Sequence, residues 1–290
     1  MTKTWLGVDF GGTKVALRAE TEGGEVREHA FRWRGRGLES DLTQLAAEVT
    51  RFRRPVPAGF AGIGVAMPAT VGADGLVTTW PNRPEWTGLD LRRTFRTVFG
   101  DAPLRWADDG ELGALGEARE LGCDDLLYVG VGTGVGGGLI LGGRRWPGSF
   151  ELGHVVTDAD GPECRCGRRG CVQASASGPA TLARASSLRG APVDFDALRD
   201  GWRAGADWAV DAVDRTCHRL AVAITGVREL LAPGTVVVGG GFAGGLPGFV
   251  DSVARHVDAL ARPGVTAPVV RASPLGALST VYGAVALARL

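Results

Sequence analysis

Strand-like and helix-like patterns alternate along the first third of the chain. Apolar runs at residues 4–9 and 15–19, joined by a short glycine turn, predict a β-hairpin. An amphipathic stretch near residues 38–52 has the spacing of a helix, and the apolar run at residues 62–67 ends at a proline, as a buried strand often does. Strands and helices in this order are typical of an α/β protein.

A similar pattern returns further along the chain. Residues 107–121 begin with acidic side chains and are followed by Gly122, which is typical of a helix. Residues 126–131 and 137–141 predict a second hairpin around another Gly-Thr turn. Residues 202–231 have the pattern of one long amphipathic helical region, and residues 235–238 that of a strand. With one such hairpin in each half, we expect two related α/β halves that face one cleft.

Length and charge limit the kinds of partner that we expect. A chain of 290 residues is long enough for two domains. Its 32 basic and 32 acidic side chains cancel, so no net field favours nucleic acid or a membrane surface. No secretory leader is recognisable, and the uncharged stretch 126–143 is too rich in glycine for a membrane helix. We therefore expect a cytoplasmic protein with a small-molecule substrate, no nucleic-acid partner and no membrane contact.

Two glycine-rich turns are candidates for binding phosphate. The first is Gly11-Gly12-Thr13-Lys14, with Asp9 at the end of the strand before it, and the second is Gly132-Thr133-Gly134. Glycine lets backbone N–H groups approach phosphate oxygens, and the Asp9 carboxylate could reach the Mg²⁺ that accompanies a nucleotide. Each turn alone is equally consistent with an ordinary hairpin. Because both occur in one chain, phosphate binding is the favoured interpretation.

Three cysteines and a histidine follow one another closely. They are His154, Cys164, Cys166 and Cys171. One imidazole and three thiolates form a complete tetrahedral donor set for zinc, and the arginines between them make the segment too polar for a core. Because four protein ligands leave no position for water, we expect a structural zinc.

Two adjacent carboxylates, Asp108 and Asp109, precede the helix expected at residues 107–121. They are candidates for general base catalysis. They are also well placed to cap the helix and to complement its dipole, and position alone favours this second interpretation.

Together these segments resemble the ROK family of repressors, open reading frames and sugar kinases, in the actin-like ATPase superfamily. The resemblance spans the chain. Four segments carry it: Val8-Asp9-Phe10-Gly11-Gly12-Thr13-Lys14, Asp108-Asp109 with Ala114-Leu115-Gly116-Glu117, Gly132-Thr133-Gly134-Val135-Gly136-Gly137-Gly138, and Glu151-Leu152-Gly153-His154 with the three cysteines.

The resemblance implies two actin-like, ribonuclease-H-like α/β domains flanking a cleft. The expected boundaries are residues 1–105, with a helix at about 280–290 packing back on them, and residues 106–279, which include the zinc loop. It further implies a homodimer and an ATP-dependent, Mg²⁺-dependent kinase for a sugar or sugar-like polyol.

The resemblance also implies roles for individual residues. Asp109 would be the general base that takes the proton of the acceptor hydroxyl. Asn82, Glu151 and His154 resemble the family's sugar contacts, with His154 shared with the zinc. Gly239, Gly240 and Gly241 resemble the family's glycine turn on the adenosine side.

Two departures from the family bear on the acceptor. The family has Asn-Asp where this chain has Asp108-Asp109, and Glu after the last zinc cysteine where this chain has Gln173. Both positions touch the sugar in the glucokinases, so we expect a modified acceptor. Candidates are a C7-cyclitol of secondary metabolism or an amino sugar whose ammonium meets Asp108. The sequence favours the cyclitol, because Gln173 removes one negative charge while Asp108 adds one. A catalytically inactive ROK-type sugar sensor is the alternative from another class.

Overall fold

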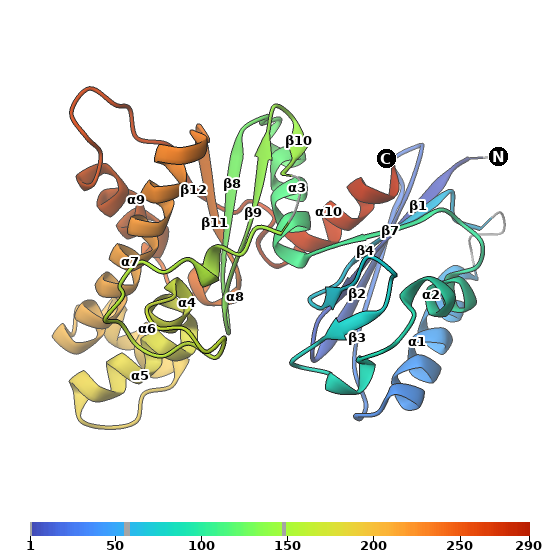
Figure 1. The fold of residues 1–290 in the computed structure, drawn as a ribbon, viewed down its shortest axis with the longest axis horizontal. Helices are drawn as coiled ribbons and strands as arrows, with labels where there is room; N and C mark the ends of the chain where they lie inside the picture. The colour runs from blue at the N-terminus through green and yellow to red at the C-terminus, as the bar shows by residue number, and fades with distance from the viewer. Residues whose placement is uncertain (1, 55–58, 147–148) are drawn as a thin grey trace. The chain divides into compact units, whose positions relative to one another are not determined.

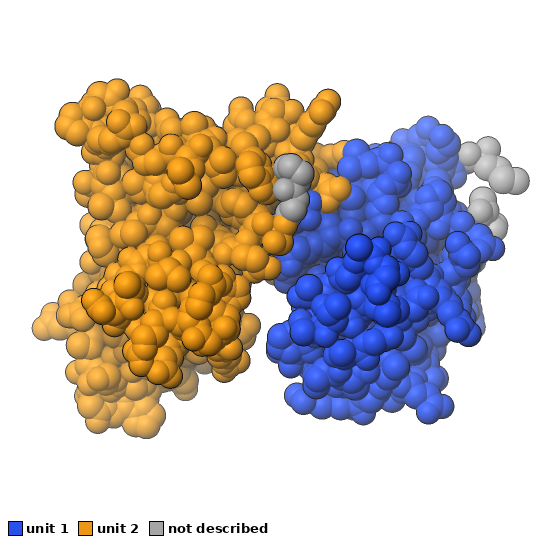
Figure 2. Space-filling view, in the orientation of Figure 1, with its two compact units in different colours: residues 1–112, 280–290 blue, residues 113–279 orange. Residues whose placement is uncertain are grey.

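The computed structural model describes residues 2–54, 59–146 and 149–290 of the chain. These residues form two compact units, coloured separately in Figure 2. Unit 1 contains residues 1–112 and 280–290, and unit 2 contains residues 113–279. Among the described helices, none has both the length and the apolar character needed to cross a membrane.

Unit 1 is built on a five-stranded sheet with the order β3-β2-β1-β4-β7 (Figure 1). Its strands are β1 (Thr4–Phe10), β2 (Lys14–Thr21), β3 (Val26–Arg32), β4 (Gly62–Ala66) and β7 (Leu104–Ala107). The first three pair antiparallel, while β1, β4 and β7 run parallel. A small separate ribbon pairs β5 (Thr70–Val71) with β6 (Val77–Thr79).

Helices cover both faces of the unit 1 sheet. One face of β1 carries apolar side chains, and on the other face a glycine leaves room for a helix to approach the backbone. Leu6, Val8 and Phe10 pack with α1 (Leu38–Arg53) and α2 (Leu91–Phe99) in one core. On the opposite face Gly7 lies so close to α10 (Ser279–Ala288) that a Cβ there would sit 2.6 Å from the Val285 amide nitrogen. The C-terminal helix therefore packs directly on the sheet. The 3₁₀ turn η1 (Pro84–Trp86) completes this unit.

Unit 2 repeats the sheet of unit 1. Its order is β10-β9-β8-β11-β12, with strands β8 (Leu126–Val131), β9 (Val135–Leu141), β10 (Arg144–Arg145), β11 (Thr235–Gly239) and β12 (Val269–Ala272). Again three strands pair antiparallel and two more continue the sheet parallel to β8. The prediction of an α/β fold with two like halves is confirmed.

Most of the described helices belong to unit 2. They are α3 (Asp109–Leu121), which begins in unit 1, η2 (Leu152–His154), α4 (Val172–Ala176), α5 (Gly178–Arg189), α6 (Phe195–Arg203), α7 (Asp207–Leu231), α8 (Gly241–Gly244), α9 (Phe249–Ala259) and η3 (Gly276–Leu278). The core of unit 2 includes Leu220 and Ile224 of α7 with Val236 and Val238 of β11.

Two predicted boundaries were wrong. The helical region expected over residues 202–231 is two helices, because Gly205 takes the left-handed backbone conformation (φ 69°) and ends the first one. The strand expected from residue 137 begins at Val135, which pairs with Val131 across the Gly-Thr turn.

Candidate active site and metal centre

Three carboxylates gather at one edge of the unit 1 sheet. Asp9 lies near the end of β1, and Asp108 and Asp109 follow β7 directly. Because β1, β4 and β7 are parallel neighbours, their carboxyl ends share one edge, where α/β proteins commonly bind ligands. This topology brings together residues that are a hundred positions apart in the sequence.

The surroundings of these carboxylates favour their protonated forms. Burial raises the pKa of Asp9 to about 6, with Lys14 opposing the change. Burial, together with the negative charges of Asp108 and Asp9, raises the pKa of Asp109 to about 7. A carboxylate with a pKa near neutrality suits a general base, which must accept a proton at the working pH.

Asp108 also caps helix α3. Its Oδ1 accepts a hydrogen bond from the Gly110 amide at 2.9 Å, so the capping interpretation is confirmed for this residue. Burial raises the pKa of the Asp108 carboxyl, although the hydrogen bonds that it accepts from backbone amides of α3 oppose the change. Asp109 is the first residue of α3, and its backbone oxygen accepts a hydrogen bond from Thr280 Oγ1 at 3.4 Å. The backbone of Asp109 is therefore held at the start of a helix.

The first glycine turn joins β1 to β2 in unit 1. The Gly11 amide donates to the Lys14 oxygen at 2.8 Å and closes the turn, which carries Thr13 exposed at its tip. Asn82 packs against it so closely that a Cβ on Gly12 would lie 2.7 Å from the Asn82 Cβ. The residue proposed for sugar contact thus lies beside the turn proposed for phosphate.

The second glycine turn occupies the equivalent edge of unit 2. The Gly132 amide donates to the Gly134 oxygen, and the Gly132 oxygen accepts from the Gly178 amide at the start of α5. Gly240, which follows β11, has φ 90°, and a Cβ there would lie 2.4 Å from the Val131 oxygen. The turn with Thr133 and the turn of Gly240 and Gly241 are therefore packed together.

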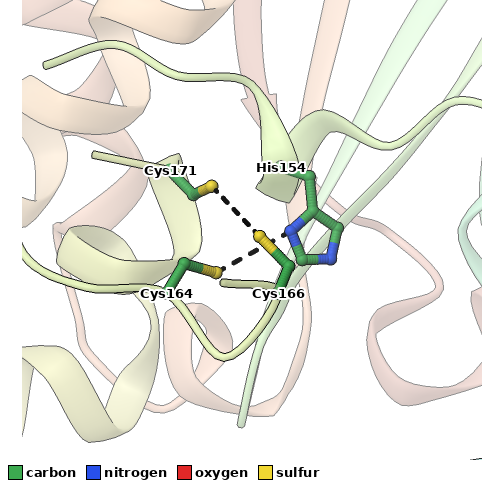
Figure 3. A group of neighbouring side chains, drawn as sticks. All are labelled: His154, Cys164, Cys166 and Cys171. Atoms are coloured by element: carbon green, nitrogen blue, oxygen red, sulfur yellow. Dashed lines mark hydrogen bonds between the residues drawn. The ribbon is translucent and has the colours of Figure 1, made fainter. Parts of the chain in front are cut away.

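The four predicted zinc ligands converge in unit 2 (Figure 3). Their donor atoms all lie within 4.8 Å of one another. Cys164 Sγ is 3.8 Å from His154 Nδ1, and Cys166 Sγ is 3.6 Å from Cys171 Sγ. Tetrahedral zinc with bonds of ~2.0–2.3 Å places its ligand atoms roughly 3.5–3.8 Å apart, so the Cys164–His154 and Cys166–Cys171 distances suit the ion. His154 turns its other ring nitrogen away from the sulfur atoms (Figure 3).

Backbone contacts hold the residues around this cluster. Gly153 packs directly against β9, where a Cβ on it would be 2.0 Å from the Val135 oxygen. This contact fixes the backbone of the short segment that carries Glu151 and His154. Gln173 follows the last cysteine, and its Nε2 donates to Cys164 Sγ at 3.5 Å. Its Oε1 lies 3.1 Å from the position of a Cβ on Gly134. Gln173 therefore bridges the cysteine loop and the second glycine turn within unit 2.

The candidate residues form two groups. Unit 1 contains Asp9, the first glycine turn, Asn82, Asp108 and Asp109. Unit 2 contains the second glycine turn, the Gly240 turn, Glu151, Gln173 and the cluster of His154 with the three cysteines. Sequence reasoning missed Trp33, Asp41 and Arg83, which contact the first turn or one another. The position of Arg83 between Pro81 and Pro84 was a signal, but its partner Asp41 lies 42 positions away.

Comparison with known families gives the same interpretation as the motifs. The ROK family matches this chain over residues 5–290. The chain belongs to the ROK family. Proteins that resemble it include the kanosamine kinase of Amycolatopsis mediterranei, 52% identical over 98% of this chain and 96% of the relative. A glucokinase of Thermotoga maritima is 30% identical over 82% of each chain.

A solved ROK structure has the same fold. The ROK hexokinase of Thermus thermophilus superposes with a TM-score of 0.88 at 29% identity, covering 99% of this chain and 98% of that one. The predicted family, the actin-like α/β fold and the activity of an ATP-dependent carbohydrate kinase are confirmed by these comparisons. The residue roles, the zinc, the magnesium and the homodimer stay predictions.

Proposed function

We propose that this ROK kinase transfers phosphate from ATP to a hydroxyl of an amino sugar, with Asp109 as general base and Asp108 facing the sugar's ammonium group. The observation that carries the proposal is the 52% identity to a kanosamine kinase along almost the whole chain. Kanosamine is an amino sugar, a glucose in which an amine replaces one hydroxyl.

The chemistry of Asp108 supports an ammonium partner. An ionised carboxylate only accepts hydrogen bonds, and an ammonium group only donates them, whereas a sugar hydroxyl does both. The pair would form a charge-assisted hydrogen bond, which is roughly twice as strong as a neutral one. Burial and the repulsion from Asp108 and Asp9 raise the pKa of Asp109, and a positive charge here would offset the repulsion.

The proposed mechanism divides the work among named groups. The Asp109 carboxylate accepts the proton of the attacking hydroxyl, while the N–H groups of the two glycine turns bind the phosphate oxygens of ATP. Asp9 would hold Mg²⁺, which supplies positive charge to the triphosphate when it is bound. Asn82 and Glu151 are the candidates for hydrogen bonds to the other hydroxyls of the sugar.

We also propose that His154, Cys164, Cys166 and Cys171 hold a structural zinc. The donor set and its spacings support this role. Zinc on Nδ1 would leave the outward-facing Nε2 of His154 as a hydrogen-bond donor for the sugar. Cysteines that stay reduced to bind a metal, and a substrate such as ATP, both suit a cytoplasmic enzyme. We expect a homodimer, as the family resemblance suggests.

A C7-cyclitol is the second candidate acceptor. The departures at Asp108 and Gln173 support it in the same way, because they change the pattern of donors and acceptors that the site offers. A cyclitol without nitrogen gives the Asp108 charge no partner of opposite sign, and the similarity to a kanosamine kinase favours the amino sugar.

An ADP-release assay with mass analysis of the product tests the proposal. Purified protein with ATP and Mg²⁺ should form ADP and a monophosphate of kanosamine in equal amounts. The parallel reactions contain glucose, N-acetylmannosamine or a C7-cyclitol. A cyclitol phosphate formed faster than any amino-sugar phosphate would replace the proposal by its alternative.

A further inference from the structure

The carbonyl oxygens of Gly11, Gly12 and Thr13 accept hydrogen bonds from residues outside the first glycine turn. Gly11 O accepts a hydrogen bond from Trp33 Nε1 at 3.0 Å, and Gly12 O accepts one from Arg83 Nε at 3.3 Å. Thr13 O accepts one from the Trp33 amide at 3.2 Å. Three successive carbonyls of the turn are thus bound by only two residues.

This arrangement fixes the direction of the turn's N–H groups. In a trans peptide the C=O and the following N–H point in opposite directions, and no described peptide bond is cis. Holding the oxygens of Gly11 and Gly12 therefore turns the amides of Gly12 and Thr13 the other way. Within the described residues these two amides have no hydrogen-bond acceptor. They are oriented donors that an anion could accept.

Arg83 is itself locked in place. Its side chain is 4% exposed and pairs with the carboxylate of Asp41, which is 1% exposed and also accepts from Trp86 Nε1 at 2.9 Å. The guanidinium carbon lies 4.5 Å from the centre of the Trp33 ring. A buried ion pair with such stacking tolerates little movement, because either charge alone would be desolvated without a partner. The Arg83 side chain therefore holds the first glycine turn in a fixed position.

We propose that Trp33 and Arg83 are positioning residues for ATP, which hold the first glycine turn so that its Gly12 and Thr13 amides face the triphosphate. The inference rests on the proposed ATP site and adds the residues that orient it. Arg83 directly follows Asn82, so the same segment links the orientation of the phosphate turn to the proposed sugar contact.

Nucleotide binding to two matched tryptophan variants tests this role. Trp33→Phe keeps a large aromatic ring but removes the donor to Gly11 O. Trp80→Phe makes the same chemical change in the same unit at a buried indole whose Nε1 has no partner among the described residues. Calorimetry would measure Kd for AMPPNP, an ATP analogue with a full triphosphate, and for AMP, in the presence of Mg²⁺.

We expect Trp33→Phe to weaken AMPPNP binding by about tenfold, since one hydrogen bond that orients the turn is lost, and to leave AMP binding within about twofold. Trp80→Phe should leave both Kd values within about twofold. Equal weakening of AMPPNP and AMP, or no change in either, in Trp33→Phe would overturn the proposal. The measurement needs no sugar, so its outcome is independent of the amino-sugar assignment.

Arg83→Lys gives a second test in kinetic terms. Lysine keeps the charge beside Asp41, but a single ammonium cannot replace the planar fork that reaches both Asp41 and Gly12 O. We expect KM for ATP to rise by about tenfold with KM for the sugar changed less. An unchanged KM for ATP would remove Arg83 from the proposal, and if this variant does not fold, the Trp33→Phe measurement decides alone.

Discussion

Replacing Asp108 by Asn should convert the enzyme from an amino-sugar kinase toward a glucose kinase. The change removes one negative charge but keeps the size of the side chain and its ability to cap α3 through Gly110. Asn and Asp are about equally good N-caps, so the helix that carries Asp109 should remain stable. The effect should therefore appear in substrate preference and in the titration of Asp109.

The expected magnitude follows from the lost ion pair. A hydrogen bond to a charged group contributes about 1.5–3 kcal/mol, which corresponds to a loss of about 10- to 150-fold in kcat/KM for kanosamine. Glucose brings no charge to this position, so its kcat/KM should stay within about threefold or rise. Because the Asp108 charge helps to raise the pKa of Asp109, the pKa of Asp109 should fall in this variant.

The assay is ADP release at saturating ATP, with kanosamine or glucose varied across the pH range 5 to 9. Asp194→Asn is a matched control, since Asp194 caps α6 by accepting from the Ala197 amide at 2.8 Å and belongs to no proposed site. Equal losses for glucose and kanosamine in Asp108→Asn, with an unmoved pH profile, would refute the proposed ammonium contact.

Five further outcomes are expected. Asp109→Asn should lower kcat by about a hundredfold or more at unchanged AMPPNP binding, and a near wild-type rate would leave Asp109 as a helix residue only. In the wild type, kcat/KM should fall below about pH 7 as Asp109 becomes protonated, and a profile flat to pH 5 would contradict its raised pKa. The pKa of Asp109 is about 7 in the folded protein and 3.8 in the unfolded chain. Its contribution to the free energy of unfolding is therefore complete below pH 3.8 and is lost as the pH rises through about 7. Asp109→Asn should accordingly raise Tm at pH 8 but not at pH 3.5, as differential scanning fluorimetry would measure. Cys166→Ser should lose zinc by elemental analysis while Cys123→Ser keeps it, and equal metal contents would exclude the proposed ligand set. Gln173→Glu should release zinc faster to a chelator, because a carboxylate cannot donate to Cys164 Sγ and would repel the thiolate; an unchanged release rate would remove that role.

The sequence predicted the fold well where local patterns decide it. Apolar runs with short turns located both hairpins, and the acidic start before Gly122 located α3, because strand alternation and helix capping act over a few residues. The grouping of the four proposed zinc ligands was also predictable, since Cys164, Cys166 and Cys171 lie within one loop and His154 lies ten positions before Cys164.

Contacts between distant segments could not be predicted in the same way. The pairing of Asp41 with Arg83 and the hydrogen bond from Trp33 to Gly11 depend on how three separate elements pack. The raised pKa of Asp109 likewise depends on Asp9, which is brought near it only by the order of the parallel strands. The preference between a cyclitol and an amino sugar was also beyond local pattern, because it depends on the joint effect of Asp108 and Gln173 on one bound molecule.

A competition experiment tests the central claim most directly. The wild-type enzyme is given equal concentrations of kanosamine and glucose with limiting ATP, and mass spectrometry measures the two sugar phosphates at early times. Their ratio equals the ratio of the kcat/KM values. The account predicts at least about tenfold more kanosamine phosphate, as expected for one charge-assisted hydrogen bond to Asp108. An excess of glucose phosphate, or equal amounts of the two products, would contradict it.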